Sequence, residues 1–109
     1  MDIELISVEA DLLLAADSDR QVAYVMEKCA QLGAPVVSRM NVTMENTHLT
    51  EIIAQAWKRS SVVMIICQNG KDLKTVRKLI AEKVLNRKND ELSEQDVLLE
   101  RHGGNYAGV

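Results

Sequence analysis

The chain has 109 residues, of which 47% are hydrophobic, so it fits one domain with a core large enough to fold on its own. A net charge of −3 and a scarcity of aromatic residues (one Trp, two Tyr, no Phe) argue against a nucleic-acid-binding protein. The amino-terminal residues do not form a signal-peptide pattern, and no apolar run reaches the roughly 18 residues that a membrane span needs. We therefore expect a cytoplasmic protein without membrane contact.

The first predicted unit is a strand followed by a helix. Residues 3 to 8 combine alternating polarity with β-branched side chains, which is typical of a strand. Residues 17 to 19, Asp-Ser-Asp, are typical of a helix N-cap, and Gly33 is expected to end the helix as a C′ glycine. Between them, apolar residues recur at helical spacing, at Val22, Val25, Cys29 and Leu32.

The second unit repeats this order. Pro35 is expected to open a strand over residues 36 to 42, because proline is tolerated at the first position of a strand and not in its middle. A second amphipathic helix is expected to follow, capped near Asn46 or Thr47, with an apolar stripe made by Leu49, Ile52, Ile53, Ala56 and Trp57.

The third unit contains the most apolar segment of the chain. Residues 62 to 67, Val-Val-Met-Ile-Ile-Cys, form a continuous apolar run, which is typical of a parallel strand covered on both faces, so we predict that this strand is the middle of the sheet. Residues 68 to 70 predict a turn, and helical periodicity then continues to about Asn86.

The carboxy-terminal part of the chain is polar. The sequence predicts one domain over residues 1 to 88 and a short helix with a flexible tail over residues 89 to 109. The helix is expected near a capping-box pattern at residues 93 to 96, and disorder is expected from Gly103 onward.

Alternating strands and helices predict an α/β fold. We expect a three-layer α/β sandwich, with a mostly parallel sheet built from three βα units. Ligands of such folds bind beyond the carboxyl ends of the strands. The loops at residues 8 to 19, 42 to 48 and 67 to 72 are therefore where a site is expected.

The third of these loops is a candidate anion site. Gly70, Lys71 and Asp72 lead into a helix whose free amides could hold a phosphate, and Lys71 and Lys74 add positive charge. An ordinary strand-to-helix turn explains the same residues, because one glycine does not make a phosphate-binding glycine-rich loop. The stretch from residue 71 to 88 also carries seven of the thirteen basic residues, which suits either a solvated face or an acidic partner.

The first loop carries carboxylates. Glu9 and Asp11 could hold Mg²⁺ or accept hydrogen bonds from a ligand, and Asp17 and Asp19 follow closely. Helix capping and loop solubility explain these residues as well. Of this group, Asp11 and Asp19 are retained as candidate ligand-binding residues.

No residue is singled out as catalytic or as a metal ligand. Cys29 and Cys67 lack the C-x-x-C spacing of a zinc or redox site, and the cytoplasm would keep both reduced. Cys67 ends the third strand, where a nucleophile could act, but a buried structural cysteine is the more common case. Neither His48 nor His102 has a partner that the sequence can place.

Residues 3 to 88 resemble the molybdopterin-binding (MoCF-type) fold, specifically the amino-terminal domain of the competence/damage-inducible CinA family. Residues 3 to 14 stand where that family has a first strand running into glycine-threonine-glutamate-leucine-leucine; Asp11 falls on its acidic position, and Glu9 replaces its glycine. Residues 19 to 21 occupy its asparagine-threonine-asparagine, and residues 59 to 61 resemble the arginine-serine-aspartate before its central strand. In the third loop, Gly70 and Asp72 remain of a longer glycine-rich motif.

The resemblance implies a molybdopterin-binding-like fold and a homo-oligomer. Related domains bind molybdopterin or its adenylated form, and the CinA family is associated with hydrolysis of nucleotide pyrophosphates such as ADP-ribose. The possible ligands are therefore a molybdopterin or a nucleotide with Mg²⁺, a small phosphorylated molecule in either case. Because two glycines of the third loop carry side chains here, we expect a non-catalytic ligand-binding or assembly module.

Two alternatives remain open. One is a Mg²⁺-dependent nucleotide pyrophosphatase, in which Asp11 and Asp72 hold the metal and Lys71 stabilises phosphate charge. The other is a partner-binding domain that uses the basic helix of residues 71 to 88.

Overall fold

The computed structural model describes residues 2–85, 99–102 and 105–108. The expected α/β architecture is confirmed: three parallel strands alternate with three α-helices, and the strands lie in the order β2-β1-β3. The elements of this part are β1 (Ile3–Glu9), η1 (Leu12–Leu14), α1 (Ala15–Gln31), β2 (Val36–Thr43), α2 (Leu49–Arg59), β3 (Val62–Cys67), α3 (Gly70–Leu79) and the π-helical turn η2 (Ile80–Val84).

The central strand is β1, so the prediction that residues 62 to 67 form the middle of the sheet is wrong. β1 pairs with β2 on one side and with β3 on the other, and all seven of its residues are buried. Apolar content did not identify the central strand, because β1 contains Glu4, Ser7 and Glu9. The polar groups of these residues are hydrogen-bonded within the protein. A strand with such satisfied polar groups can be buried completely.

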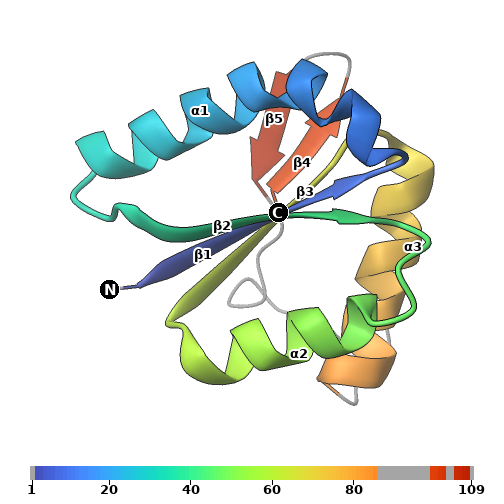
Figure 1. Cartoon of the computed structure of the whole chain (residues 1–109). Coiled ribbons are helices and arrows are strands. Elements are labelled where there is room, and N and C mark those ends of the chain that lie inside the picture. Colours follow the sequence, from blue (N-terminus) through green and yellow to red (C-terminus); the bar gives the residue numbers. More distant parts are fainter. Residues whose placement is uncertain (1, 86–98, 103–104, 109) are drawn as a thin grey trace.

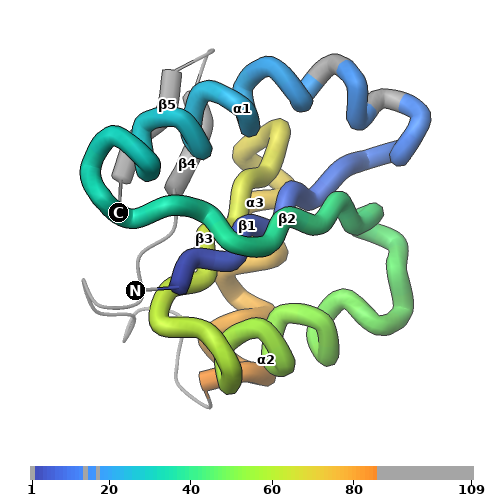
Figure 2. The backbone as a smooth tube through the Cα atoms, turned by 60° about the vertical axis from the view of Figure 1, so that its left-hand side comes forward, coloured from blue at the N-terminus to red at the C-terminus, as the bar shows by residue number. Residues whose placement is uncertain are grey.

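The helices cover both faces of the sheet and so form three layers (Figure 1, Figure 2). Alternate residues of β1 point to opposite faces: Ile3 and Leu5 pack toward α1, whereas Ile6 and Val8 pack toward α2 and α3. Each face has its own apolar cluster. The cluster on the α1 side contains Ile3, Leu5, Val22, Val25, Cys29 and Ile66; the other contains Ile6, Val8, Val42, Leu49, Ile53, Ala56, Val63, Ile65, Cys67, Leu73, Val76 and Ile80.

The first helix begins earlier than its sequence suggests. Asp11 caps η1 by accepting a hydrogen bond from the Leu13 amide, and α1 follows directly, so residues 17 to 19 lie inside the helix and not at its N-cap. The end is as expected: Gly33 has a φ of 78°, and the Ala34 amide donates to the Cys29 carbonyl. This is the left-handed cap that favours glycine.

The other two helices begin with asparagine contacts. The N-cap of α2 is His48, whose side chain makes no capping hydrogen bond, so the predicted cap at Asn46 or Thr47 is wrong. Asn46 accepts a hydrogen bond from the His48 amide just before the helix. Asn69 is the N-cap of α3, and its side chain accepts from the Asp72 amide. The turn at residues 68 to 70 therefore leads from a strand into a helix, as its sequence predicts.

The carboxy-terminal residues include two further strands. β4 (Leu99–His102) and β5 (Asn105–Gly108) pair antiparallel, and β4 lies against β3 and α3. The sequence predicts disorder from Gly103 onward, whereas the structure places residues 105 to 108 in a strand. Most of the predicted short helix falls on residues 86–98, outside the described part of the chain. Among the helices that the structure describes, none has the length and apolar character of a membrane span.

Candidate functional site

The carboxyl ends of β1 and β3 lie side by side, because Val8 is the register partner of Cys67. The chain leaves β1 into α1 on one face of the sheet and leaves β3 into α3 on the other face. Such a switch point is the usual ligand site of an open α/β sheet. The loop with Asp11 and the start of α3 both border this edge.

Glu9 is the last residue of the central strand, and its side chain is buried inside the protein. The residue is only 1% exposed, and Oε1 accepts hydrogen bonds from the Ser7 hydroxyl at 2.6 Å and the Ser18 hydroxyl at 2.7 Å. Ser18 lies on α1, so the contact ties this helix to the sheet. Glu9 therefore serves an internal hydrogen-bond network, and the space next to the strand end is filled by its carboxyl group.

The polar groups of the third loop bind one another. The Asp72 amide donates to Asn69 Oδ1 at 2.8 Å, and the Asn69 amide group donates to Asp72 Oδ2 at 3.1 Å. The first bond is the N-cap of α3, and the second joins the two side chains. Gly70 has an ordinary φ, and a Cβ placed there would meet no atom within 4 Å, so the backbone does not require glycine at this position.

The structure gathers some of the predicted ligand residues and separates others. Gly70, Lys71, Asp72 and Lys74 share the first turns of α3, where both lysines are exposed. Asp11 caps η1 after β1. Asp19 forms an ion pair with Arg39, which lies beside Leu5 near the middle of β2 and not in a loop. Within the described residues, no three Asp, Glu, His or Cys side chains cluster as metal ligands would.

The nucleophile candidate is not poised for reaction. Cys67 is buried at the end of β3, and burial raises the pKa of its thiol to about 12, with the carboxyl groups of Asp72 and Glu9 adding to the shift. Since the thiolate is the reactive form, this thiol is inert at neutral pH. His48 lies on the surface before α2 and contacts Glu51, with 3.4 Å between Nδ1 and Oε2.

A second polar centre lies on the other face of β1, and sequence reasoning missed it. Glu4 is buried, and its carboxyl group accepts hydrogen bonds from Arg59 Nε and Nη2 at 2.7–3.0 Å and from the Ser60 hydroxyl. These hydrogen bonds, Arg59 first and Ser60 next, hold the pKa of Glu4 below its usual range. The pair joins the central strand to the end of α2. The sequence signal for this centre was Glu4, a glutamate between apolar residues of a predicted strand. Its partner lies 55 positions away, so the sequence pattern could not identify it.

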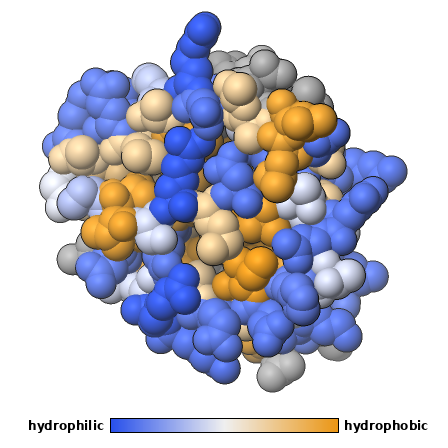
Figure 3. Space-filling view, viewed as in Figure 1, coloured by the Kyte–Doolittle hydropathy of each residue, from blue (hydrophilic) through white to orange (hydrophobic). Residues whose placement is uncertain are grey.

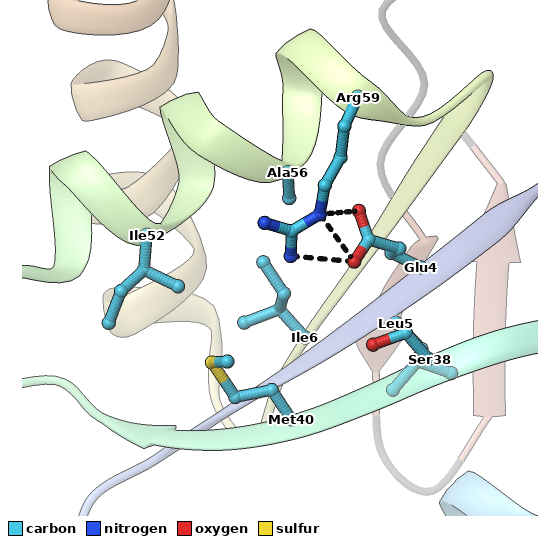
Figure 4. A pocket seen from close by; sticks show the side chains of 8 residues that line it. All are labelled: Glu4, Leu5, Ile6, Ser38, Met40, Ile52, Ala56 and Arg59. Atoms are coloured by element: carbon cyan, nitrogen blue, oxygen red, sulfur yellow. Dashed lines mark hydrogen bonds and ion pairs between the residues drawn. The ribbon is translucent and has the colours of Figure 1, made fainter.

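This ion pair borders a small cavity between α2 and the sheet (Figure 4). Met40 of β2 and Ile52 of α2 line its apolar side, and the guanidinium group of Arg59 reaches toward it from the end of the helix. The complete lining is Glu4, Leu5, Ile6, Ser38, Met40, Ile52, Ala56 and Arg59.

A larger groove adjoins the cavity and opens between α2 and β2. Its volume is about 220 Å³, and its lining is Met40 of β2 with Glu51, Ile52, Gln55 and Arg59 of α2. Figure 3, viewed from the side where β2 lies in front, shows hydrophobic residues in the middle of this face, surrounded by hydrophilic ones. The exposed apolar side chains of β2 are Val37 and Met40.

No protein-family model, curated protein or solved structure matches this chain. The fold itself is clear: this is a small α/β domain with three parallel strands in βα units. Of the residues on which the resemblance to the CinA family rests, Asp11, Gly70 and Asp72 lie at the carboxyl edge of the sheet.

Proposed function

We propose that this chain is a divergent molybdopterin-binding-like domain of the CinA type that is catalytically silent and acts as an assembly module in a homo-oligomer. The observation that supports the proposal is that the reactive side chains at the carboxyl edge of the sheet are not free to bind a ligand. Glu9, Asp11, Asp72 and Cys67 are side chains there that chemistry could use, and each is hydrogen-bonded within the protein or buried. The described groove and the exposed apolar residues of β2 lie elsewhere, along the outer edge of the sheet.

The residue at position 9 supports this proposal most directly. The resemblance aligns Glu9 with a glycine, the residue type that lets a ligand approach the backbone closely. Here the position carries a buried carboxyl group held by two serine hydroxyls. A ligand seated at this strand end would have to displace a hydrogen-bonded side chain, which disfavours binding.

A second candidate function is electrostatic docking of an acidic partner on α3. Lys71, Lys74 and Lys78 are all exposed, and their spacing places them on one face of the helix. Exchanging these three lysines for glutamate tests this candidate, because association with an acidic partner should then disappear and should weaken with salt in the unmodified protein. The corresponding change at Lys28, Lys58 and Arg20, on other helices, is the matched control.

The main proposal is tested by assaying ligand binding and turnover together. Calorimetry with ADP-ribose, ATP and a pterin phosphate, each with and without Mg²⁺, should give no heat of binding, and ADP-ribose should not be hydrolysed. The Asp72→Asn variant is the control, because it preserves the shape of the side chain and the backbone cap. Hydrolysis by the unmodified protein that this variant loses would establish the Mg²⁺-dependent pyrophosphatase instead and refute the proposal.

A further inference from the structure

We infer that the outer edge of β2 and the groove below it form a two-fold interface with a second copy of this chain. The inference rests on the proposed assembly role and names the surface that performs it. In this arrangement β2 pairs antiparallel with β2 of the partner, and the two α2 helices lie side by side and antiparallel. The two three-stranded sheets thereby become one continuous sheet.

The edge strand itself is the first reason. β2 pairs with β1 on one side, and among the described residues no strand pairs with its other side. An exposed edge is usually protected by charges, proline, a β-bulge or short length. β2 has eight residues, contains no proline, and its one charged residue, Arg39, is paired with Asp19 of its own chain. The register shift after Val36 leaves the regular stretch beyond Val37 available for pairing.

The charge pattern of α2 indicates that the partner at this surface is a second copy of the chain. Glu51, Gln55 and Arg59 line the groove and are spaced four residues apart, so they form one stripe along the helix. The stripe is acidic at one end, neutral in the middle and basic at the other end. A two-fold axis through Gln55 brings Glu51 of each copy opposite Arg59 of the other, and a stripe of this kind is complementary to itself.

The side chains are available for such contacts. Glu51 is 70% exposed. Arg59 uses Nε and Nη2 for Glu4, but its side chain remains 58% exposed, and its third guanidinium nitrogen points away from Glu4 (Figure 4). Met40 is 40% exposed at the centre of β2 and faces the same groove, so the axis that passes through Gln55 also brings two copies of Met40 together.

The size of the surface sets the expected strength. An eight-residue strand is roughly 26 Å long, and strand and helix together present a face roughly 20 Å wide, which gives about 500 Å² for each copy. Stable complexes bury about 800 Å² for each partner, so this dimer belongs to the weak class with a dissociation constant in the micromolar range. It should therefore appear only as the protein concentration is raised.

The first experiment measures the dissociation constant by sedimentation equilibrium from about 5 to about 500 μM protein, a range set by that weak class. Met40→Lys places a charge at the centre of the interface and should raise the constant at least tenfold. Leu32→Lys makes the same kind of change on an 84% exposed residue at the end of α1 and should leave the constant within about twofold. Glu51→Lys should raise it about fivefold, because two ion pairs become repulsive.

The second experiment is independent of any loss of folding. Gln55→Cys places one thiol of each copy at the two-fold axis, where a disulfide can form. Mild oxidation should convert this variant to a covalent dimer, whereas Thr75→Cys on α3 should form no disulfide-linked dimer. The native cysteines, Cys29 and Cys67, are buried and do not compete.

The outcomes separate the interface from the assembly role. A protein that stays monomeric over the whole concentration range refutes both. A dimer that Met40→Lys leaves unchanged, or in which Gln55→Cys cross-links no faster than Thr75→Cys, refutes the interface and leaves the assembly role in place.

Discussion

The ion pair of buried Glu4 and exposed Arg59 gives the sharpest prediction about stability, because its two members differ in exposure. The Glu4 side chain is 8% exposed and that of Arg59 is 58% exposed. Removing the arginine leaves a carboxylate in a dry site, whereas removing the negative charge leaves a guanidinium that water already reaches. The two substitutions should therefore differ in cost, although they break the same ion pair.

The expected magnitudes follow from these environments. Arg59→Gln leaves the carboxylate of Glu4, which is 8% exposed, without its main hydrogen-bond donor, and an unsatisfied buried acceptor costs about 1 to 3 kcal/mol, so this variant should lower the free energy of unfolding by about 2 kcal/mol. Glu4→Gln preserves an acceptor for the Ser60 hydroxyl and should cost about 1 kcal/mol. With a urea m-value of about 1 kcal/mol/M, the midpoints should fall by about 2 M and 1 M.

The assay is urea unfolding followed by circular dichroism, at a low protein concentration so that self-association does not contribute. The pKa of Glu4 is lowered in the folded protein, so its contribution is present above the ordinary value of 4.5 and is lost as the pH falls through the lowered pKa. The deficit of Arg59→Gln should consequently shrink below pH 4.5. Equal costs for the two variants, or a deficit that does not depend on pH, would refute the reasoning.

Three further substitutions or treatments test other contacts. Ser18→Ala removes one of the two hydroxyl donors to buried Glu9 and should lower the melting temperature by about 5 to 10 °C, whereas exposed Ser61→Ala should not change it measurably. Gly33→Ala should cost about 1 kcal/mol in urea unfolding because its φ is 78°, and a variant as stable as the unmodified protein would contradict the left-handed cap. The Cys67 thiol, with a pKa of about 12, should resist iodoacetamide at about pH 8 until urea unfolds the chain; rapid labelling of folded protein would show that it is accessible.

The fold was largely predictable because local signals and the overall architecture agree. The apolar run over residues 62 to 67 matches β3 residue for residue, and the Asn-Gly turn after it leads into α3 as expected. The order of the strands was not predictable from apolar content. β1 owes its central position to polar residues whose partners lie on other elements, and single-sequence patterns do not reveal such partners.

The sequence correctly placed some of the candidate ligand residues at the edge of the sheet, but it did not reveal which contacts their side chains make. Asp11 and Asp72 do lie at the carboxyl edge of the sheet, as their positions after β1 and β3 required. Both, however, take part in helix caps, which is the alternative that the sequence left open. Asp19 was placed with the loop, but it lies far enough along α1 to reach Arg39 of β2, because the helix begins before residue 17.

The two buried glutamates of β1 connect the interior of the domain with the surface proposed for a second copy. Glu4 and Glu9 point to opposite faces of the central strand, one bound to the end of α2 and the other to the start of α1. Each contact fixes a helix at one position on the sheet, because a buried carboxyl group without its partner would be costly. The groove beside β2 is lined by Met40 and by residues of α2, so the contact of Glu4 with Arg59, which fixes the end of α2 on the sheet, also shapes the surface proposed for a second copy.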